Sequence, residues 1–353
     1  MAEESVRYGM IGCGEIAVRS FEGLMAAANA ELAATFDVKQ ELAQDLAGRV
    51  GGAAPCASQD ELLARDDVEA VIISTPHFLH EPIAIAALRA GKHVLVEKPI
   101  ACTVEQGQRM VDCAAETGGL LGVCFVRRYI PGTEAVRRFV AAGHIGSVMG
   151  WVLVEMSYKK ETYWTGGYSQ RAQTDWRLRR RTAGGGFLIM NTIHTLDHFR
   201  YVSGQEVVDV QALAGTYNSP EGVEVEDLFG AAVKLSGGGI GTIAGGSAVP
   251  GGVRGNAQRL IGTKGQINFE AADAEGVPVY VQEEVEFEGR TIPGGEWTKV
   301  DFAGGVHGNS RALLIEGFGR WVRGAEPFRA PGDDALKSLA ACEEVYRAAG
   351  LVD

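Results

Sequence analysis

The sequence predicts a two-domain α/β protein: a doubly wound parallel sheet, followed by an α+β domain with a large, mostly antiparallel open sheet. Apolar strands alternate with helical stretches over the first third of the chain, which is typical of a parallel sheet covered on both faces. Later, short strands are joined by glycine or polar turns. At 353 residues the chain is long enough for two cores. We expect domains over 1–126 and 127–353.

The first strand and the turn after it are typical of a dinucleotide-binding unit. Val6–Ile11 is an apolar run that fits a buried parallel strand, and it leads into the sequence GCGEIA from Gly12 to Ala17. In this GxGxxA turn the first glycine permits a tight bend and the second lets the backbone approach a pyrophosphate, while Ala17 permits close packing of helix on strand. The free N–H groups of the predicted helix, Ala17–Asn29, would face the phosphates. This pattern predicts a Rossmann domain.

An acidic residue at the end of the second strand indicates which dinucleotide binds. A strand over Glu31–Phe36 ends in Asp37, which follows Gly14 by 23 positions. About 20 positions are expected for the acid that binds the adenosine ribose. A carboxylate there accepts hydrogen bonds from ribose hydroxyls and repels a 2′-phosphate, so NAD is favoured. Lys39 would soften that repulsion, and use of NADP stays open.

The alternation of strands and helices continues to Phe125. Strands are predicted at Ala70–Ser74, His93–Val96 and Leu120–Phe125, and helices at Glu81–Ala90 and Thr103–Thr117. Ligands of doubly wound sheets bind at the carboxyl ends of the strands. We therefore expect the residues at these ends to contact the cofactor. The predicted cofactor-binding residues are Gly12, Gly14, Glu15, Ile16, Asp37, Ser74, Thr75, Pro76, His77, His80, Glu97 and Lys98.

Composition excludes several classes of partner. The formal net charge is −12. Proteins that bind nucleic acids or anionic membranes usually carry clusters of Lys and Arg, so this charge argues against both as the main partner. The first residues lack the basic and apolar regions of a signal peptide, and no apolar run approaches about 18 residues. We therefore expect a cytoplasmic protein. The cysteines show no CxxC pair and no regular spacing, so we expect small buried hydrophobes and no metal site. They are Cys13, Cys56, Cys102, Cys113, Cys124 and Cys342.

Four segments resemble the Gfo/Idh/MocA family, the glucose-fructose oxidoreductase and inositol dehydrogenase group. They are GCGEIA, STPHFLH at Ser74–His80, AGKHVLVEKPIA at Ala90–Ala101 and AGGGFLIMNTIHTLDHFRYVSG at Ala183–Gly204. The EKP tripeptide after a strand, with a distant HxxD, is the most specific part. The resemblance implies hydride transfer between a nicotinamide cofactor and a secondary hydroxyl or ketone of a sugar, inositol or related polyol. It also implies a C-terminal sheet whose free face serves a homodimer or homotetramer.

The resemblance further implies roles for individual residues. Lys98 would stand beside the nicotinamide and the reacting hydroxyl, where a cationic ring depresses a lysine pKa and favours proton relay. His194 would be the general base, since the ordinary histidine pKa lies near operating pH. Asp197, on the same helical face at i+3, would orient the imidazole or belong to a core network. Glu97 would orient Lys98 or hold the cofactor.

The sequence departs from the family at one position. Many relatives carry an acid four residues before the histidine, where this chain has Met190 with Asn191 beside it. A thioether cannot take a proton or align a hydroxyl strongly. Either Asn191 substitutes as a polar substrate contact, or the substrate is held differently.

Residues 158–181 have a composition of their own. Seven basic residues outnumber two acids, and Tyr and Trp are interleaved with them. We predict a long loop that lines the substrate entrance, because aromatic faces suit sugar rings and Arg can bind their hydroxyls. The alternative is a solvated or subunit-interface loop. The predicted substrate contacts are Lys98, Arg128, Trp176, Arg177, Asn191 and His194.

Two other functions stay open on the same scaffold. One is a redox-neutral glycosidase that uses bound NAD for transient oxidation, and the other is a non-enzymatic NAD-sensing regulator. The presence of both Lys98 and His194 favours catalysis over sensing, because a sensor needs no proton-transfer pair.

Overall fold

The computed structural model describes residues 4–251, 255–304 and 308–352, so the first three residues of the N-terminal stretch discussed above lie outside it. The chain forms two compact units. The first comprises Met1–Tyr129, Lys160–Gly185 and Gly308–Leu339, and the second comprises the remaining chain. The predicted boundary at 126/127 therefore lies near the end of the first of these three segments, at Tyr129, and does not include the other two. Two later segments belong to the first unit because they pack on it.

A parallel sheet forms the centre of the first unit, as predicted. Its order is β3-β2-β1-β4-β5-β6, and every neighbouring pair is parallel. The strands read as continuous apolar runs because helices cover both faces, and all four residues of β4 are buried. The strands are β1 (Val6–Ile11), β2 (Ala30–Phe36), β3 (Ala54–Pro55), β4 (Ala70–Ile73), β5 (His93–Val96) and β6 (Leu121–Val123).

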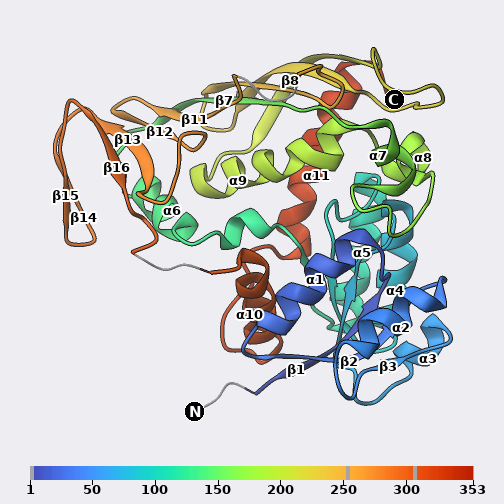
Figure 1. Ribbon diagram of the computed structural model, residues 1–353. Helices are drawn as coiled ribbons and strands as arrows, with labels where there is room; N and C mark the ends of the chain where they lie inside the picture. Colours follow the sequence, from blue (N-terminus) through green and yellow to red (C-terminus); the bar gives the residue numbers. More distant parts are fainter. Residues whose placement is uncertain (1–3, 252–254, 305–307, 353) are drawn as a thin grey trace. The chain divides into compact units, whose positions relative to one another are not determined.

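Three helices of the first unit, over Gln59–Leu63, Val104–Thr117 and Ser310–Val322, start at capping side chains. Thr103 accepts a hydrogen bond from the Gln106 N–H, and Asn309 accepts from Arg311 and Ala312. Helix α10, far along the chain, packs beside α1 (Figure 1). The helices are α1 (Glu15–Ala26), α2 (Gln40–Gly48), α3 (Gln59–Leu63), α4 (His80–Arg89), α5 (Val104–Thr117) and α10 (Ser310–Val322), with 3₁₀ turns η1 (His77–Leu79) and η2 (Val126–Tyr129).

The segment at residues 160–185 belongs to the first unit and has little regular structure. Its elements are the short helices α7 (Glu161–Gly166) and α8 (Arg180–Ala183) and the 3₁₀ turn η3 (Trp176–Leu178). This agrees with the predicted long loop in that no element exceeds two turns. We refer to it below as the 160–185 segment.

An eight-stranded sheet forms the second unit, in the order β16-β13-β12-β11-β7-β10-β9-β8. Only β7 and β10 pair in parallel among the strands of this sheet, so it is mostly antiparallel, as predicted. The strands are β7 (Val148–Met156), β8 (Val207–Gly215), β9 (Leu228–Leu235), β10 (Ile240–Gly246), β11 (Ala257–Gly262), β12 (Gly265–Asn268), β13 (Val277–Val281) and β16 (Trp297–Val300), beside the small hairpin of β14 (Val285–Phe287) and β15 (Arg290–Ile292).

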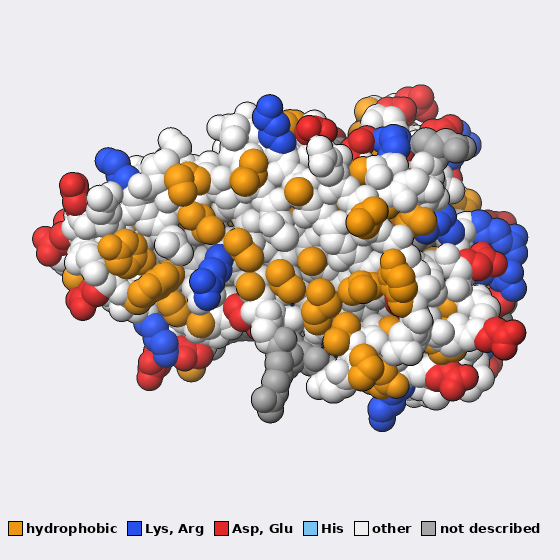
Figure 2. All heavy atoms as spheres, turned by 90° about the horizontal axis from the view of Figure 1, so that it is seen from above, with side chains coloured by type: hydrophobic (Ala, Val, Ile, Leu, Met, Phe, Trp, Pro, Cys, Tyr) orange, Lys and Arg blue, Asp and Glu red, His pale blue; other side chains and the backbone are white. Residues whose placement is uncertain are grey.

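The two faces of this sheet differ. On one face lie α6 (Thr133–Ala141) and α9 (Ile193–Ser203), which pack together, and α11 (Gly332–Ala348) ends in this unit. On the other face, buried and exposed residues alternate along β9, with its exposed side chains turned away from the helices. Figure 2 shows hydrophobic side chains spread over this open face, with few charges among them.

Two expectations about burial and membrane insertion can be compared with the structure. All six cysteines are buried, as expected from their apolar surroundings. Within residues 4–251, 255–304 and 308–352, no helix combines the length and apolar character that a bilayer crossing requires.

Candidate active site

A cavity of about 420 Å³ opens in the first unit at the carboxyl ends of its strands. This volume is within the usual range of small-molecule sites. Eight predicted cofactor contacts line it, whereas His77, His80, Glu97 and Lys98 do not. The eight are Gly12, Gly14, Glu15, Ile16, Asp37, Ser74, Thr75 and Pro76.

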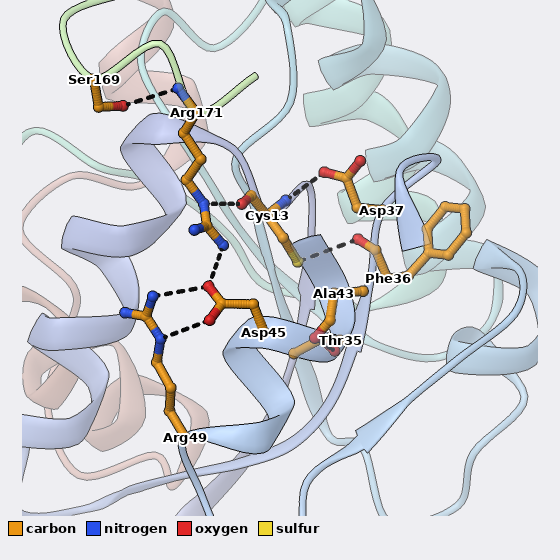
Figure 3. A network of polar contacts seen from close by, with 9 residues as sticks. All are labelled: Cys13, Thr35, Phe36, Asp37, Ala43, Asp45, Arg49, Ser169 and Arg171. Carbon is orange, nitrogen blue, oxygen red and sulfur yellow. Dashed lines mark hydrogen bonds and ion pairs between the residues drawn. The ribbon is translucent and has the colours of Figure 1, made fainter. Parts of the chain in front are cut away.

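The glycine turn is held in a conformation that only glycine adopts without strain. Gly12 has φ +87°, and a Cβ there would lie 2.8 Å from the carbonyl carbon of Ser74. Cys13 N–H donates to Asp37 Oδ2 at 2.7 Å, and Lys39 N–H donates to Oδ1 at 2.8 Å (Figure 3 shows the first contact). The Asp37 carboxylate is therefore fixed against the glycine turn, where the sequence placed the ribose-binding acid.

His80 lies behind the cavity wall and links two of its segments. The ring is fully buried, with Nε2 3.1 Å from the Thr75 carbonyl oxygen and Nδ1 2.9 Å from that of Pro99. Burial lowers its pKa, which keeps the ring neutral, so one nitrogen donates at a time. His80 thus ties the end of β4 to the Glu97-Lys98-Pro99 segment after β5. Both ring nitrogens of His80 therefore face backbone carbonyl oxygens of the protein.

His77 is buried in the same wall. Its Nδ1 lies 2.7 Å from the Ala183 carbonyl oxygen, and its ring centroid lies 4.4 Å from that of Trp176. Burial, then the neighbouring His80 and Lys98, lower the pKa of His77 well below its ordinary value. A neutral His77 therefore connects η1 to the 160–185 segment.

Glu97 is buried and ion-paired. Its side chain is 5% exposed, and Oε1 accepts from the Arg311 guanidinium and from the Ser20 hydroxyl at 3.3 Å. Arg311 also donates to Ser20 Oγ at 2.9 Å. Of the two roles predicted for Glu97, this geometry favours positioning, because the carboxylate faces α1 and α10. The half-buried Lys98 follows it at the end of β5.

Three predicted substrate contacts lie in the first unit besides Lys98. Trp176 and Arg177 line the same cavity, and the Arg177 guanidinium carbon lies 4.5 Å from the Trp176 ring centroid. Arg128 is 1% exposed and pairs with Asp334 at 2.6 Å, while it also donates to the Arg329 carbonyl. Its guanidinium is thus committed inside the unit, which gives Arg128 a structural role rather than the predicted substrate contact.

The second unit holds the remaining predicted catalytic residues on α9. One π-turn, Leu188–Thr192, leads into this helix and contains the buried Met190 and half-buried Asn191. His194 is half-buried. Asp197 is fully buried and lies 3.6 Å from Arg200, an ion-pair contact within the helix. Whether it also orients the His194 imidazole stays a prediction.

A buried carboxylate fixes the start of this segment. Glu226 Oε2 accepts from Gly186 N–H at 2.7 Å, and Oε1 accepts from Leu188 N–H at 3.0 Å and from the Tyr346 hydroxyl at 2.9 Å. Tyr346 also accepts from Ile189 N–H at 3.3 Å. These contacts satisfy the free N–H groups that open the helix bearing His194.

Sequence models of one family match both units. The model described as "Oxidoreductase family, NAD-binding Rossmann fold" matches residues 6–125, and the "GFO/IDH/MocA C-terminal domain" model matches residues 133–268. The chain belongs to the Gfo/Idh/MocA family. The predicted resemblance is thereby confirmed, and with it an NAD-binding Rossmann domain.

Two relatives agree with this assignment, and one solved structure shares the fold. The chain is 32% identical over 62% of its length to 1,5-anhydro-D-fructose reductase of Ensifer adhaerens, and 30% identical over 60% to inositol 2-dehydrogenase of Rhizobium meliloti. The matches span 63% and 58% of those relatives. The WlbA dehydrogenase of Bordetella pertussis, solved with NADH and UDP-GlcNAcA, shares the fold: TM-score 0.83, 23% identity, 99% of this chain and 97% of that one.

Four residues with long-range contacts escaped the sequence analysis: three contact the segments around Lys98 and His194, and one, Arg171, lies in the 160–185 segment. Arg311, Glu226 and Tyr346 lie far along the chain from the groups they contact, and no local pattern marks them. Arg171 appeared only as one member of a basic stretch. The basic composition of residues 158–181 marked this segment as unusual, but composition alone does not show which groups Arg171 contacts.

Proposed function

We propose that this Gfo/Idh/MocA chain is an NAD(P)-dependent oxidoreductase that transfers a hydride between nicotinamide and a secondary hydroxyl or ketone of a sugar, inositol or related polyol. The observation that carries the proposal is the cavity in which the glycine turn, Asp37 and Ser74–Pro76 converge. The names of the matched reductase and dehydrogenases support the substrate class.

The residues around the cavity fit a dinucleotide. The backbone of Gly12 and Gly14 leaves room for a pyrophosphate at the start of α1, and Asp37 offers carboxylate oxygens to ribose hydroxyls. Trp176 and Arg177 line the same cavity and would contact the cofactor, the substrate or both. The bound cofactor supplies the hydride acceptor or donor at C4 of the nicotinamide.

Protein groups supply the proton transfer. His194 takes the hydroxyl proton as the carbinol carbon loses its hydride, and Lys98 donates a hydrogen bond to the substrate oxygen. Glu226 and Tyr346 hold the segment before His194, while Glu97 and His80 hold the segment around Lys98. Asn191 takes the place of the family acid as a neutral substrate contact. In reverse, the same groups protonate a ketone.

Absorbance of the reduced nicotinamide tests the proposal directly. The purified protein is incubated with NAD or NADP and a panel of inositols, aldoses and anhydrosugars. We expect stoichiometric NADH from at least one polyol or sugar, with NAD preferred because Asp37 repels a 2′-phosphate.

The same panel separates the alternatives. Tight NAD binding without net reduction on any compound would contradict the proposal. Cleavage of aryl glycosides would then identify a redox-neutral glycosidase, and its absence would favour an NAD-sensing regulator.

We also propose that the open face of the large sheet joins two copies of this chain. One row of paired residues crosses it from Trp297 through Tyr280, Gln266 and Ile261 to Ile240. Trp297 is 49% exposed and Ile240 73% exposed. Adjacent apolar side chains on a flat surface are typical of an interaction face.

Light scattering after gel filtration tests this interface. We expect a dimeric or tetrameric mass for the wild type and a smaller mass for Thr242→Arg, which puts an unpaired charge on the exposed side of β10. Thr291→Arg makes the same change on the separate hairpin strand β15 and should leave the mass unchanged. A monomeric wild type, or an unchanged mass for Thr242→Arg, would contradict the proposal.

A further inference from the structure

The 160–185 segment is attached directly to the glycine turn of the first unit. Arg171 extends from it toward the turn, and its Nε donates to the Cys13 carbonyl oxygen at 3.0 Å (Figure 3). Cys13 is the middle residue of the GxG sequence. Its N–H already donates to Asp37 at 2.7 Å, so both polar groups of this residue's backbone are held by charged side chains.

A second contact fixes the direction of the Arg171 side chain. Its Nη2 lies 2.6 Å from Asp45 Oδ2 on α2, and Arg49 binds the same carboxylate at 2.8 Å (Figure 3). Hydrogen bonds from Arg171, then from Arg49, hold the pKa of Asp45 below its ordinary value, so Asp45 is ionised at neutral pH. The Arg171 side chain is 18% exposed and that of Arg49 is 41% exposed. Arg171 is therefore the better shielded of the two.

Two more contacts attach the segment on either side of Arg171. Tyr168 N–H donates to the Glu15 carboxylate at 2.8 Å, and Lys39 Nζ lies 3.3 Å from the Gln173 carbonyl oxygen. Gly167 has φ +69°, and Glu15 occupies the place of any Cβ there, so this close approach requires glycine. Glu15 opens α1 directly after the glycine turn, and Lys39 follows Asp37.

The attached segment forms part of the cavity wall. Its residues Gly166, Ala172, Thr174, Trp176 and Arg177 line the cavity together with the glycine turn. Ala172, next to Arg171, would contact a Cβ at Gly14 at 3.5 Å. A dinucleotide in this cavity would thus contact the segment that Arg171 attaches to the turn.

We propose that Arg171 is a positioning residue for the dinucleotide: it fixes the Cys13 carbonyl of the glycine turn and keeps the 160–185 segment closed over the bound cofactor. A turn already held in its binding conformation loses less freedom on binding, so affinity rises. A closed wall slows release more than it slows binding, and most affinity differences among variants lie in the dissociation rate. The inference rests on NAD binding and is independent of the proposed sugar substrate.

The test compares Arg171→Gln with Arg49→Gln. Both remove one guanidinium from Asp45, but only Arg171 also contacts Cys13. NADH binding is measured by fluorescence titration, and its release by stopped-flow displacement with excess NAD. We expect Arg171→Gln to raise the NADH Kd about tenfold, mainly through faster release, and Arg49→Gln to change it less than about twofold. Arg171→Lys, which keeps the charge, should recover part of the loss.

The steady-state parameters distinguish positioning from general loss of structure. Arg171→Gln should raise the KM for NAD and leave kcat at saturating NAD unchanged or higher. Wild-type Kd and release rate in Arg171→Gln would overturn the inference, as would equal losses in Arg171→Gln and Arg49→Gln. If Arg171→Gln does not fold, the comparison of Arg171→Lys with Arg49→Lys decides in the same way. A wild type that fails to bind NADH overturns the cofactor assignment itself, whereas failure of the sugar panel leaves this test standing.

Discussion

Lys98→Met is expected to lower kcat about 10²–10⁴-fold while the Kd for NADH changes less than about tenfold, because proton transfer contributes roughly that factor. Methionine keeps the length and apolar stem of lysine but cannot donate to the substrate oxygen. Lys98 follows β5 beside segments that His80 and Glu97 hold in place, so the backbone should be unchanged. The measurement is NADH formation at saturating NAD with the best compound of the panel.

Lys92→Met is the matched control for this variant. Lys92 lies at the opposite end of the same strand, where its Nζ donates to the Arg65 carbonyl at 2.7 Å. Its loss should leave kcat within about twofold. His194→Asn should reproduce the loss of Lys98→Met, since each removes one proton-transfer group. Full activity of Lys98→Met would contradict the role given to Lys98, and full activity of His194→Asn that given to His194.

Arg311→Met should lower the free energy of unfolding by about 3–5 kcal/mol, the usual cost of leaving one partner of a buried ion pair alone. The Glu97 side chain is 5% exposed and that of Arg311 13%, so water cannot replace the lost guanidinium. Urea denaturation followed by circular dichroism gives the value. We also expect lower activity at temperatures where the variant remains folded, because Lys98 directly follows Glu97.

Two further variants make this stability prediction specific. Adding Glu97→Gln to Arg311→Met removes the unpaired charge and should recover most of the lost stability. Arg320→Met, on the same helix α10, breaks a more exposed pair with Glu326 and should cost less than about 1 kcal/mol. Equal losses of unfolding free energy for Arg311→Met and Arg320→Met would contradict the prediction that the buried pair stabilises the fold more than the exposed pair.

The sequence predicted those parts of the fold that depend on local patterns. Val6–Ile11 and His93–Val96 form strands with those bounds, because buried parallel strands are continuous apolar runs. Asp37 lies against the glycine turn because spacing along a βαβ unit is nearly constant. The very short β3 and the hairpin β14–β15 went unpredicted, since two or three residues show no periodicity.

Long-range partners could not be predicted from one sequence. Glu97 and Arg311 are separated by 214 positions, and Glu226 and Tyr346 by 120. The charge of Arg128 suggested a substrate contact, but in the structure its guanidinium forms an ion pair with Asp334. The single predicted boundary at 126/127 did not include the later segments of the first unit. No local pattern in the sequence shows that residues 160–185 and 308–339 pack with it.

The discontinuity of the first unit has a consequence for its synthesis. Residues up to 129 can form the six-stranded sheet, but α10 and Arg311 are made only after most of the second unit. Until then Glu97 has no guanidinium beside it, and the face of α1 that packs on α10 is bare. A nascent or truncated chain ending near residue 126 therefore holds an incomplete first unit, in which α1 lacks its partner helix. The buried ion pair beside Lys98 therefore forms only after most of the second unit has been made.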